Sequence, residues 1–146
     1  MNEAAVSEAA VDSPWLIVAI IVAFFVIFPL FWSAISGLLA GISGWSGLAR
    51  RYGWQGETPA SSTTTSGRIG LVNYNGILEL GQDRSFVYLA VFPIFPFHRT
   101  LRIPREDLVI SGPTRFFFMN YMLLDVKNGP TIRVHARAWD ETVGRH

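Results

Sequence analysis

The side chains in this sequence that are best suited to acid–base or metal chemistry are three histidines, His98, His135 and His146. None of them is spaced with a second histidine or a carboxylate as in a zinc site or a hydrolase triad, and the chain contains no cysteine. Its glycines match no phosphate-binding loop. We therefore expect no catalytic residues, no cofactor and no metal ligands, and we expect that the protein is not an enzyme.

Basic residues alternate with apolar ones near the C-terminal end. Arg133, His135 and Arg137 fall at every second position, which on a β-strand places them on one face. Arg102 can join them from a neighbouring strand. Such a face can hold anionic lipid headgroups, and the alternative is the solvated side of a half-buried strand. Residues 50–146 carry twelve Lys or Arg against eight Asp or Glu, too mild a balance to predict nucleic acid as a partner. No small-molecule substrate is indicated.

Two segments are too apolar for ordinary loops. Residues 91–97 hold three Phe and two Pro, and residues 115–119 hold three consecutive Phe. Exposed aromatic patches usually mark a contact with a membrane or a partner, whereas the alternative is that half of each stretch lines the core. The histidine after the first segment either binds an anion or hydrogen-bonds to the backbone. The residues that we expect to dock against membrane or partner are Phe95, Phe97, His98 and Arg99.

A membrane-spanning helix is expected near the N-terminus. Residues 13–49 contain no charged residue and no histidine, and residues 15–32 are almost all apolar. A run of about eighteen or more apolar residues is typical of a transmembrane helix. Trp15 and Trp32 would lie about 26 Å apart on a helix, which suits anchors at the two interfaces of a bilayer. The further interfacial anchors that we expect are Trp45, Arg50, Arg51 and Tyr52.

The charges on either side of this helix predict its orientation. Three acidic residues precede it, and two arginines follow it at positions 50 and 51. Lys and Arg near a span tend to stay in the cytoplasm. We therefore expect a single-pass protein of the cell inner membrane, with its N-terminus outside and the rest of the chain in the cytoplasm. The acidic leader, Glu3, Glu8 and Asp12, also argues against a cleaved signal peptide, which begins with a basic region.

Small residues recur after the span. Ser33, Gly37 and Gly41 lie four residues apart, a spacing that lets two helices approach closely in lipid. We expect a helix–helix contact there, through self-association or with another membrane protein, and the alternative is a flexible exit from the bilayer. Pro29 either kinks the helix or forms the apex of a re-entrant hairpin. The helix is expected to continue along the inner membrane surface as far as Tyr52.

Seven short apolar segments from Arg68 onward, separated by turn residues, predict an all-β domain. The fold class expected is one N-terminal transmembrane helix plus a small antiparallel meander that closes into a barrel or sandwich. Asn75-Gly76 predicts a two-residue hairpin turn, and Gly112-Pro113 predicts a chain break. The expected divisions are 1–13, an acidic tail; 14–52, the transmembrane helix with its juxtamembrane extension; 53–67, a flexible linker; and 68–146, the β domain.

Several short motifs accompany this order of parts: Gly44-Trp45, Leu48-Ala49, Tyr52, residues 70–75, residues 92–95, His98 and residues 101–104. Together with the order of parts, they resemble a group of small uncharacterised bacterial inner-membrane proteins. The β domain is similar in outline to pleckstrin-homology-like and GRAM-like domains. The resemblance implies membrane location and fold but no activity. We therefore expect a membrane-anchored interaction module or an accessory subunit of a membrane complex, or alternatively a peripheral domain that binds or senses anionic lipid.

Overall fold

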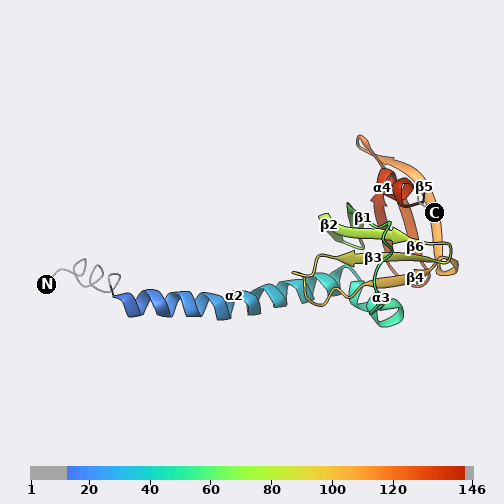
Figure 1. Cartoon of the computed structure of the whole chain (residues 1–146). Helices are drawn as coiled ribbons and strands as arrows, with labels where there is room; N and C mark the ends of the chain where they lie inside the picture. The colour runs from blue at the N-terminus through green and yellow to red at the C-terminus, as the bar shows by residue number, and fades with distance from the viewer. Residues whose placement is uncertain (1–12, 144–146) are drawn as a thin grey trace. The chain divides into compact units, whose positions relative to one another are not determined.

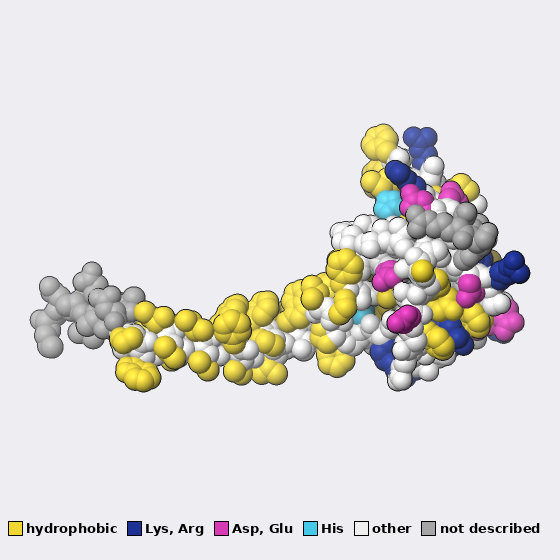
Figure 2. Space-filling view, viewed as in Figure 1, with side chains coloured by type: hydrophobic (Ala, Val, Ile, Leu, Met, Phe, Trp, Pro, Cys, Tyr) yellow, Lys and Arg dark blue, Asp and Glu magenta, His cyan; other side chains and the backbone are white. Residues whose placement is uncertain are grey.

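The computed structural model describes residues 13–143, and its first element is the long helix α2 (Pro14–Ile42) (Figure 1). The helix runs unbroken through Pro29, so the re-entrant hairpin does not form. Its most apolar stretch buries no residue against the rest of the chain, unlike a core helix, and hydrophobic side chains cover it (Figure 2). It is long and apolar enough to cross a membrane. Glu3, Glu8, Asp12 and His146 lie outside the described residues.

A second, short helix, α3 (Trp45–Tyr52), follows α2 after a break. The break is at Gly44, whose φ of 82° is left-handed and therefore suits glycine. The helix expected to continue as far as Tyr52 is therefore interrupted at Gly44. The apolar face of α3, which holds Trp45, Leu48 and Tyr52, is buried in the core of the β domain.

Within residues 13–143, seven antiparallel strands form one sheet in the order β4-β3-β2-β1-β7-β6-β5. This confirms the expected helix plus small all-β domain. The strands are β1 (Thr63–Ile69), β2 (Val72–Gln82), β3 (Phe86–Val91), β4 (Leu101–Pro104), β5 (Leu108–Phe116), β6 (Met119–Val126) and β7 (Thr131–His135).

The two edge strands, β4 and β5, are consecutive in the chain. Only the 3₁₀ turn η1 (Arg105–Asp107) separates them. Three residues cannot bridge the full width of a flat seven-stranded sheet, because neighbouring strands lie about 4.8 Å apart. The sheet therefore curls until its edges approach each other, and the result is a half-barrel.

Two of the expected turns lie inside strands. The β1–β2 turn falls at Gly70-Leu71, where Ile69 pairs with Val72, and Asn75-Gly76 instead lies in β2 where the register with β1 shifts. Both glycines have positive φ, 56° at Gly70 and 68° at Gly76, so local conformation alone does not choose between them. Gly112-Pro113 likewise lies in β5, where the pairing with β6 shifts register.

The segment expected as a flexible linker is partly structured. Residues 63–67 belong to β1, and Gly53 pairs with Leu101 beside the edge strand β4. The Trp54 N–H donates a hydrogen bond of 2.7 Å to the Thr100 carbonyl. The β domain therefore begins at Thr63, earlier than expected.

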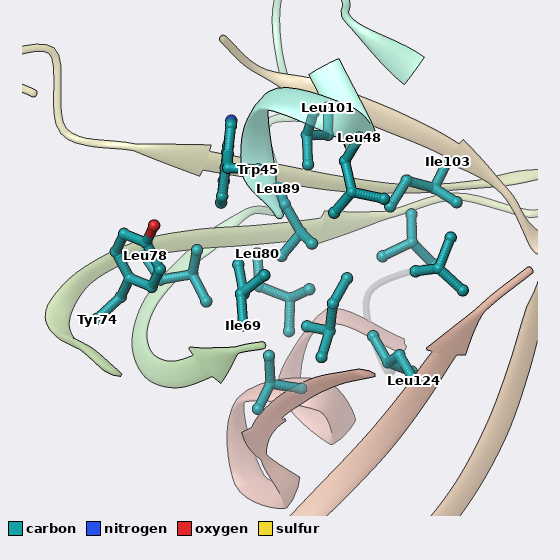
Figure 3. Packing of buried hydrophobic residues seen from close by; sticks show 14 of the residues in the cluster. Trp45, Leu48, Ile69, Tyr74, Leu78, Leu80, Leu89, Leu101, Ile103 and Leu124 are labelled. Atoms are coloured by element: carbon teal, nitrogen blue, oxygen red, sulfur yellow. The ribbon is translucent and has the colours of Figure 1, made fainter. Parts of the chain in front are cut away.

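The core lies on the inner face of the curled sheet (Figure 3). Alternate strand residues point into it, as at β4, where Leu101 and Ile103 are buried. The C-terminal helix α4 (Ala136–Val143) contacts β1, β2, β6 and β7. The buried Gln82 amide donates to the Trp139 carbonyl at 3.1 Å and to Thr142 Oγ1 at 2.6 Å, which fixes α4 to the end of β2.

The Gly70 turn supplies a test of this packing. A Cβ at Gly70 would lie 2.6 Å from the Ser43 carbonyl oxygen, whereas a Cβ at Gly76 would meet nothing within 4 Å. Gly76→Ala should cost about 1 kcal/mol of unfolding free energy for its left-handed backbone. Gly70→Ala should cost about 1–3 kcal/mol more, because it adds a clash with backbone. Denaturation of the two full-length variants in detergent micelles measures the difference, and equal losses would contradict this packing.

Candidate functional site

A buried cluster of hydroxyl and imidazole groups joins the end of α2 to the β domain. Ser36 comes from α2, Ser43 from the α2–α3 junction, Tyr74 from β2 and His98 from the loop between β3 and β4. His98 Nε2 lies 3.0 Å from the Tyr74 hydroxyl, which lies 3.1 Å from Ser43 Oγ. His98 Nδ1 lies 3.3 Å from Ser36 Oγ. We call these four residues the junction cluster.

Backbone groups and one aromatic ring complete the junction cluster. The Ser36 hydroxyl donates to the Pro96 carbonyl at 2.5 Å, and His98 Nδ1 lies 3.2 Å from the same oxygen. The Trp45 indole N–H donates to the Arg99 carbonyl at 2.9 Å, and its ring centroid lies 5.3 Å from that of His98. Hydrogen bonds therefore hold the loop after β3 against three elements: α2 through Ser36, α3 through Trp45 and β2 through Tyr74.

Burial sets the electrostatics of the junction cluster. It lowers the pKa of His98, and the hydrogen bond to the Pro96 carbonyl opposes part of that shift. Burial also raises the pKa of the Tyr74 hydroxyl, with a smaller opposite effect from its hydrogen bond to Ser43. Both groups are therefore neutral near pH 7, which is the state that a buried network favours.

The junction cluster does not have the geometry of a catalytic site. Ser36 is 1% exposed and His98 8% exposed, so a substrate atom cannot reach either side chain. The Ser36 hydroxyl also directs its proton to a carbonyl oxygen and not to the imidazole. Between residues 13 and 143, no three His, Asp or Glu side chains converge in a possible metal site. The arrangement positions the loop.

The four residues expected to dock, Phe95, Phe97, His98 and Arg99, lie in one loop but point to different sides. Phe95 is partly buried against the core. His98 belongs to the junction cluster, and its Nδ1 lies within hydrogen-bonding distance of the Pro96 carbonyl oxygen. Phe97 is 62% exposed and Arg99 is exposed. Only the last two are placed to meet a membrane or a partner.

Phe97 occupies part of the small-residue face of α2. A Cβ at Gly37 would lie 3.4 Å from Phe97 Cδ2, whereas one at Gly41 would meet nothing within 4 Å. The small residue at position 37 therefore admits a ring of the same chain. Of the residues expected in a helix–helix contact, Ser33, Gly37 and Gly41, the two glycines therefore differ: Gly37 has this intramolecular neighbour and Gly41 does not.

The basic residues expected on one face are divided. β7 ends at His135, so Arg137 lies in α4, where its Nε is 3.1 Å from Glu141 Oε1. Arg102 lies on β4, with its guanidinium 3.9 Å from the Trp54 ring centroid and 4.2 Å from that of Phe86. Arg137 is therefore separated from Arg133 and His135 because β7 ends before it, and Arg102 is separated from them because β4 and β7 are not neighbours in the sheet.

Arg133 and His135 stay together on the outer face of β7, and sequence reasoning missed their neighbour. Arg68 on β1 pairs directly with Arg133 across the sheet. The first and last strands are far apart in the chain, so periodicity along either one gives no sign of this pairing. We call Arg68, Arg133 and His135 the basic face.

Two of the expected interfacial anchors are core residues. Trp45 and Tyr52 are buried, because α3 packs into the β domain. The Tyr52 hydroxyl donates to Asp107 Oδ2 at 2.8 Å and accepts from Arg51 Nη2 at 2.7 Å, and Arg51 Nη1 donates to the Lys127 carbonyl at 2.6 Å. Of the others, Trp15 and Arg50 are exposed and Trp32 is half-buried.

The tip of the β5–β6 hairpin is the most exposed apolar part of the β domain. Phe117 is 79% exposed and Phe118 is 91% exposed, and Phe116 and Met119 beside them are exposed as well. β7 pairs with β6 only as far as Tyr121, so the tip has no third strand beside it. Figure 1 shows the hairpin projecting from the sheet. We call residues 116–119 the aromatic tip.

The chain matches no protein-family model, no curated protein and no solved structure in the three comparisons made. The fold itself defines the class: a small antiparallel half-barrel domain preceded by one apolar helix that is long enough to cross a membrane.

The junction cluster predicts a loss of stability in acid. The folded state favours neutral His98, whereas an unfolded histidine binds a proton near pH 6.5. Its contribution is therefore complete above about pH 6.5 and is lost as the pH falls from there toward the lowered folded pKa, by about 1.4 kcal/mol per pH unit at most. The melting temperature of the parent should fall between about pH 7.5 and about pH 5.5, which lie on either side of the pKa of free histidine. His98→Gln should reduce this fall.

Tyr74→Phe is the matched control, because it removes a hydroxyl from the network and leaves His98 buried. It should lower stability at both pH values by about 1 kcal/mol and keep the parent's loss in acid. A His98→Gln variant with the parent's full acid sensitivity would assign that sensitivity to other groups.

Proposed function

We propose that this protein is a non-enzymatic interaction module anchored in a membrane by α2, and that it serves as an accessory subunit of a membrane complex. The observation that carries the proposal is the aromatic tip. Its two most prominent rings, Phe117 and Phe118, are 79% and 91% exposed, and contiguous exposed apolar surface usually marks a contact. The contact covers these rings in the assembled complex.

The composition around the aromatic tip favours a protein as the occupant. Arg115 pairs with Asn120 immediately before the tip, so polar side chains surround an apolar centre. Aromatic residues, Met and Arg are enriched in protein interfaces, and the apolar centre with a polar rim is their usual anatomy. Phe117 and Phe118 lie in a two-residue turn that the Phe116–Met119 pair closes, so they are not on a loose loop.

The proposed location is the inner membrane of a bacterium, with the N-terminus outside and the β domain in the cytoplasm. Arg50 and Arg51 after α2 and the acidic residues before it support this orientation. The resemblance to small inner-membrane proteins with a pleckstrin-homology-like or GRAM-like domain supports the location. The half-barrel sheet is compatible with such a domain in outline.

A second candidate function is peripheral binding or sensing of anionic lipid. The observation that favours it is the loop after β3, where Ile94 and Phe97 are exposed beside Arg99. Phe97 contacts the α2 position Gly37. If α2 spans the bilayer, this loop lies at the membrane surface, where aromatic and basic side chains bind lipid.

Reporter fusions test the orientation. Green fluorescent protein fused after His146 should fluoresce, and alkaline phosphatase at the same position should be inactive, because each reporter works on only one side of the inner membrane. The control is a charge reversal, Arg50→Glu with Arg51→Glu, which should reduce the fluorescent fraction. Active phosphatase on the parent chain would reverse the orientation, and release of a shortened chain into the soluble fraction would identify α2 as a cleaved signal.

Site-specific photo-crosslinking in intact membranes tests the interaction. A photoreactive residue at Phe118 should give a discrete protein adduct, and the same residue at Leu71 should give none. Leu71 is the matched control because it is 74% exposed and also lies in a β-turn. An adduct of twice the chain mass would identify the partner as a second copy.

A third position separates the two candidate functions. A photoreactive residue at Phe97 should label lipid under either function, whereas position 118 labels protein only if the aromatic tip meets a partner. Lipid adducts at both positions would replace the interaction module with the lipid-binding domain. Equal labelling at 118 and 71 would remove the aromatic tip as a contact.

A further inference from the structure

Two arginines face each other across adjacent strands on the outer face of the sheet. Arg68 on β1 pairs with Arg133 on β7, which brings their Cβ atoms to about 5 Å, and like charges in this position destabilise a sheet. Among residues 13–143 the ion pair that forms is Arg137–Glu141, and neither arginine of the basic face has such a partner. The sheet therefore holds a concentrated positive charge that its own acids do not neutralise.

A hollow lies against this charge. Its volume is about 380 Å³, and its lining includes Arg68, Arg133 and His135 but no Asp or Glu. A second hollow of about 290 Å³ is also lined by the two arginines. The nearest acid by register is Asp125, diagonal to Arg133, and it accepts a hydrogen bond of 2.6 Å from Thr131.

Hydrogen bonds and aromatic rings restrain the side chains of the basic face. Arg68 donates from Nε to the Gly70 carbonyl at 3.2 Å, which leaves its two Nη groups for another acceptor. The Arg133 guanidinium carbon lies 5.3 Å from the Phe116 ring centroid and 6.0 Å from that of Tyr121. The His135 ring centroid lies 4.8 Å from that of Tyr121. Aromatic rings thus form one wall of the hollow and limit the movement of the cations.

We propose that this hollow binds a phosphate monoester through Arg68, Arg133 and His135. A phosphate monoester carries about two negative charges and three acceptor oxygens, which match two guanidinium groups and one imidazole on neighbouring strands. A carboxylate has two oxygens and is satisfied by a single arginine fork. Asn73, which pairs with Arg68 on the other side and lines the same hollow, adds an amide donor.

The larger neighbouring hollow, about 640 Å³, does not share this property. It is lined by Arg137 together with Asp140 and Glu141, so its acids outnumber its arginine. His135 lines both hollows, but only the hollow beside β1 and β7 has basic side chains without acids, so the proposed phosphate site is that one. The site goes beyond the proposed function, because its ligand is a small anion and not a partner protein. It shares Phe116 and Met119 with the aromatic tip, since both line the hollow, but not the two most exposed rings, Phe117 and Phe118.

The monoester can belong to a lipid headgroup or to a soluble compound, and three probes distinguish the sources. The full chain is placed in phosphatidylcholine nanodiscs, and the melting temperature is followed as glycerol 3-phosphate is added. In parallel, nanodiscs that contain phosphatidic acid, a monoester, are compared with nanodiscs that contain phosphatidylglycerol, a diester. A ligand that binds only the folded state raises the melting temperature, and the rise grows with the logarithm of the ligand concentration once that exceeds the dissociation constant.

The expected result is stabilisation by a monoester, either in solution or in the bilayer, that exceeds stabilisation by the diester. Arg68→Gln and Arg133→Gln should each weaken it about 10- to 100-fold in affinity. Arg137→Gln, the matched control on α4, should bind as the parent does. A response to glycerol 3-phosphate identifies a soluble ligand, and a response to phosphatidic acid alone identifies a lipid.

A second readout separates a binding site from a structural role. Without ligand, Arg68→Gln should melt at the same temperature as the parent or higher, because it removes like-charge repulsion. Absence of stabilisation by any monoester, equal responses to phosphatidic acid and phosphatidylglycerol, unchanged binding by both arginine variants, or a lower melting temperature of ligand-free Arg68→Gln would each overturn the proposal.

Discussion

The short connection between the edge strands β4 and β5 is the constraint on which the rest of the β domain depends. Three residues of η1 join strands that lie at opposite edges of the seven-stranded sheet. The sheet must curl to meet this requirement, and curling creates an inner face that only a compact insert can fill. Helix α3 supplies the insert, with Trp45 and Leu48 buried. Helix α4 packs against four of the strands, so that the alternating apolar residues of each strand have partners.

The same curl determines where polar chemistry is tolerated. At the end of α2, small and hydroxyl-bearing residues let the loop after β3 approach the helix. The polar side chains of the junction cluster are hydrogen-bonded there, and no buried side-chain nitrogen or oxygen within residues 13–143 lacks a partner. On the outer face of the sheet, some apolar and charged side chains are placed less favourably. The aromatic tip lies open to solvent and the paired arginines repel each other, and both features reduce local stability. Departures from local stability of this kind are expected at functional surfaces, and here they lie close together, since Arg133 lies over the ring of Phe116.

The long apolar helix and the exposed aromatic and basic side chains therefore belong to separate parts of one small chain. Helix α2 has the length and composition of a span, and the segment between α3 and β1 is not a free linker throughout, since Gly53 already pairs with Leu101.

Composition and periodicity were sufficient to predict α2, the all-β character of the rest and the apolar face of α3, because each depends on residues close together in the chain. The destination of that face was not predictable, since an amphipathic helix suits a membrane surface and a protein core equally well. The Gly70 turn was selected over Asn75-Gly76 by contact with Ser43 and by strand register, which involve residues far apart in sequence. Register also brought Arg68 beside Arg133 and left Arg102 elsewhere. Arg68 and Arg133 are 65 positions apart in the chain, and they meet only because β1 and β7 are neighbours in the sheet in this register. The sequence therefore determined the elements, and the tertiary structure alone decided which of their residues share a site.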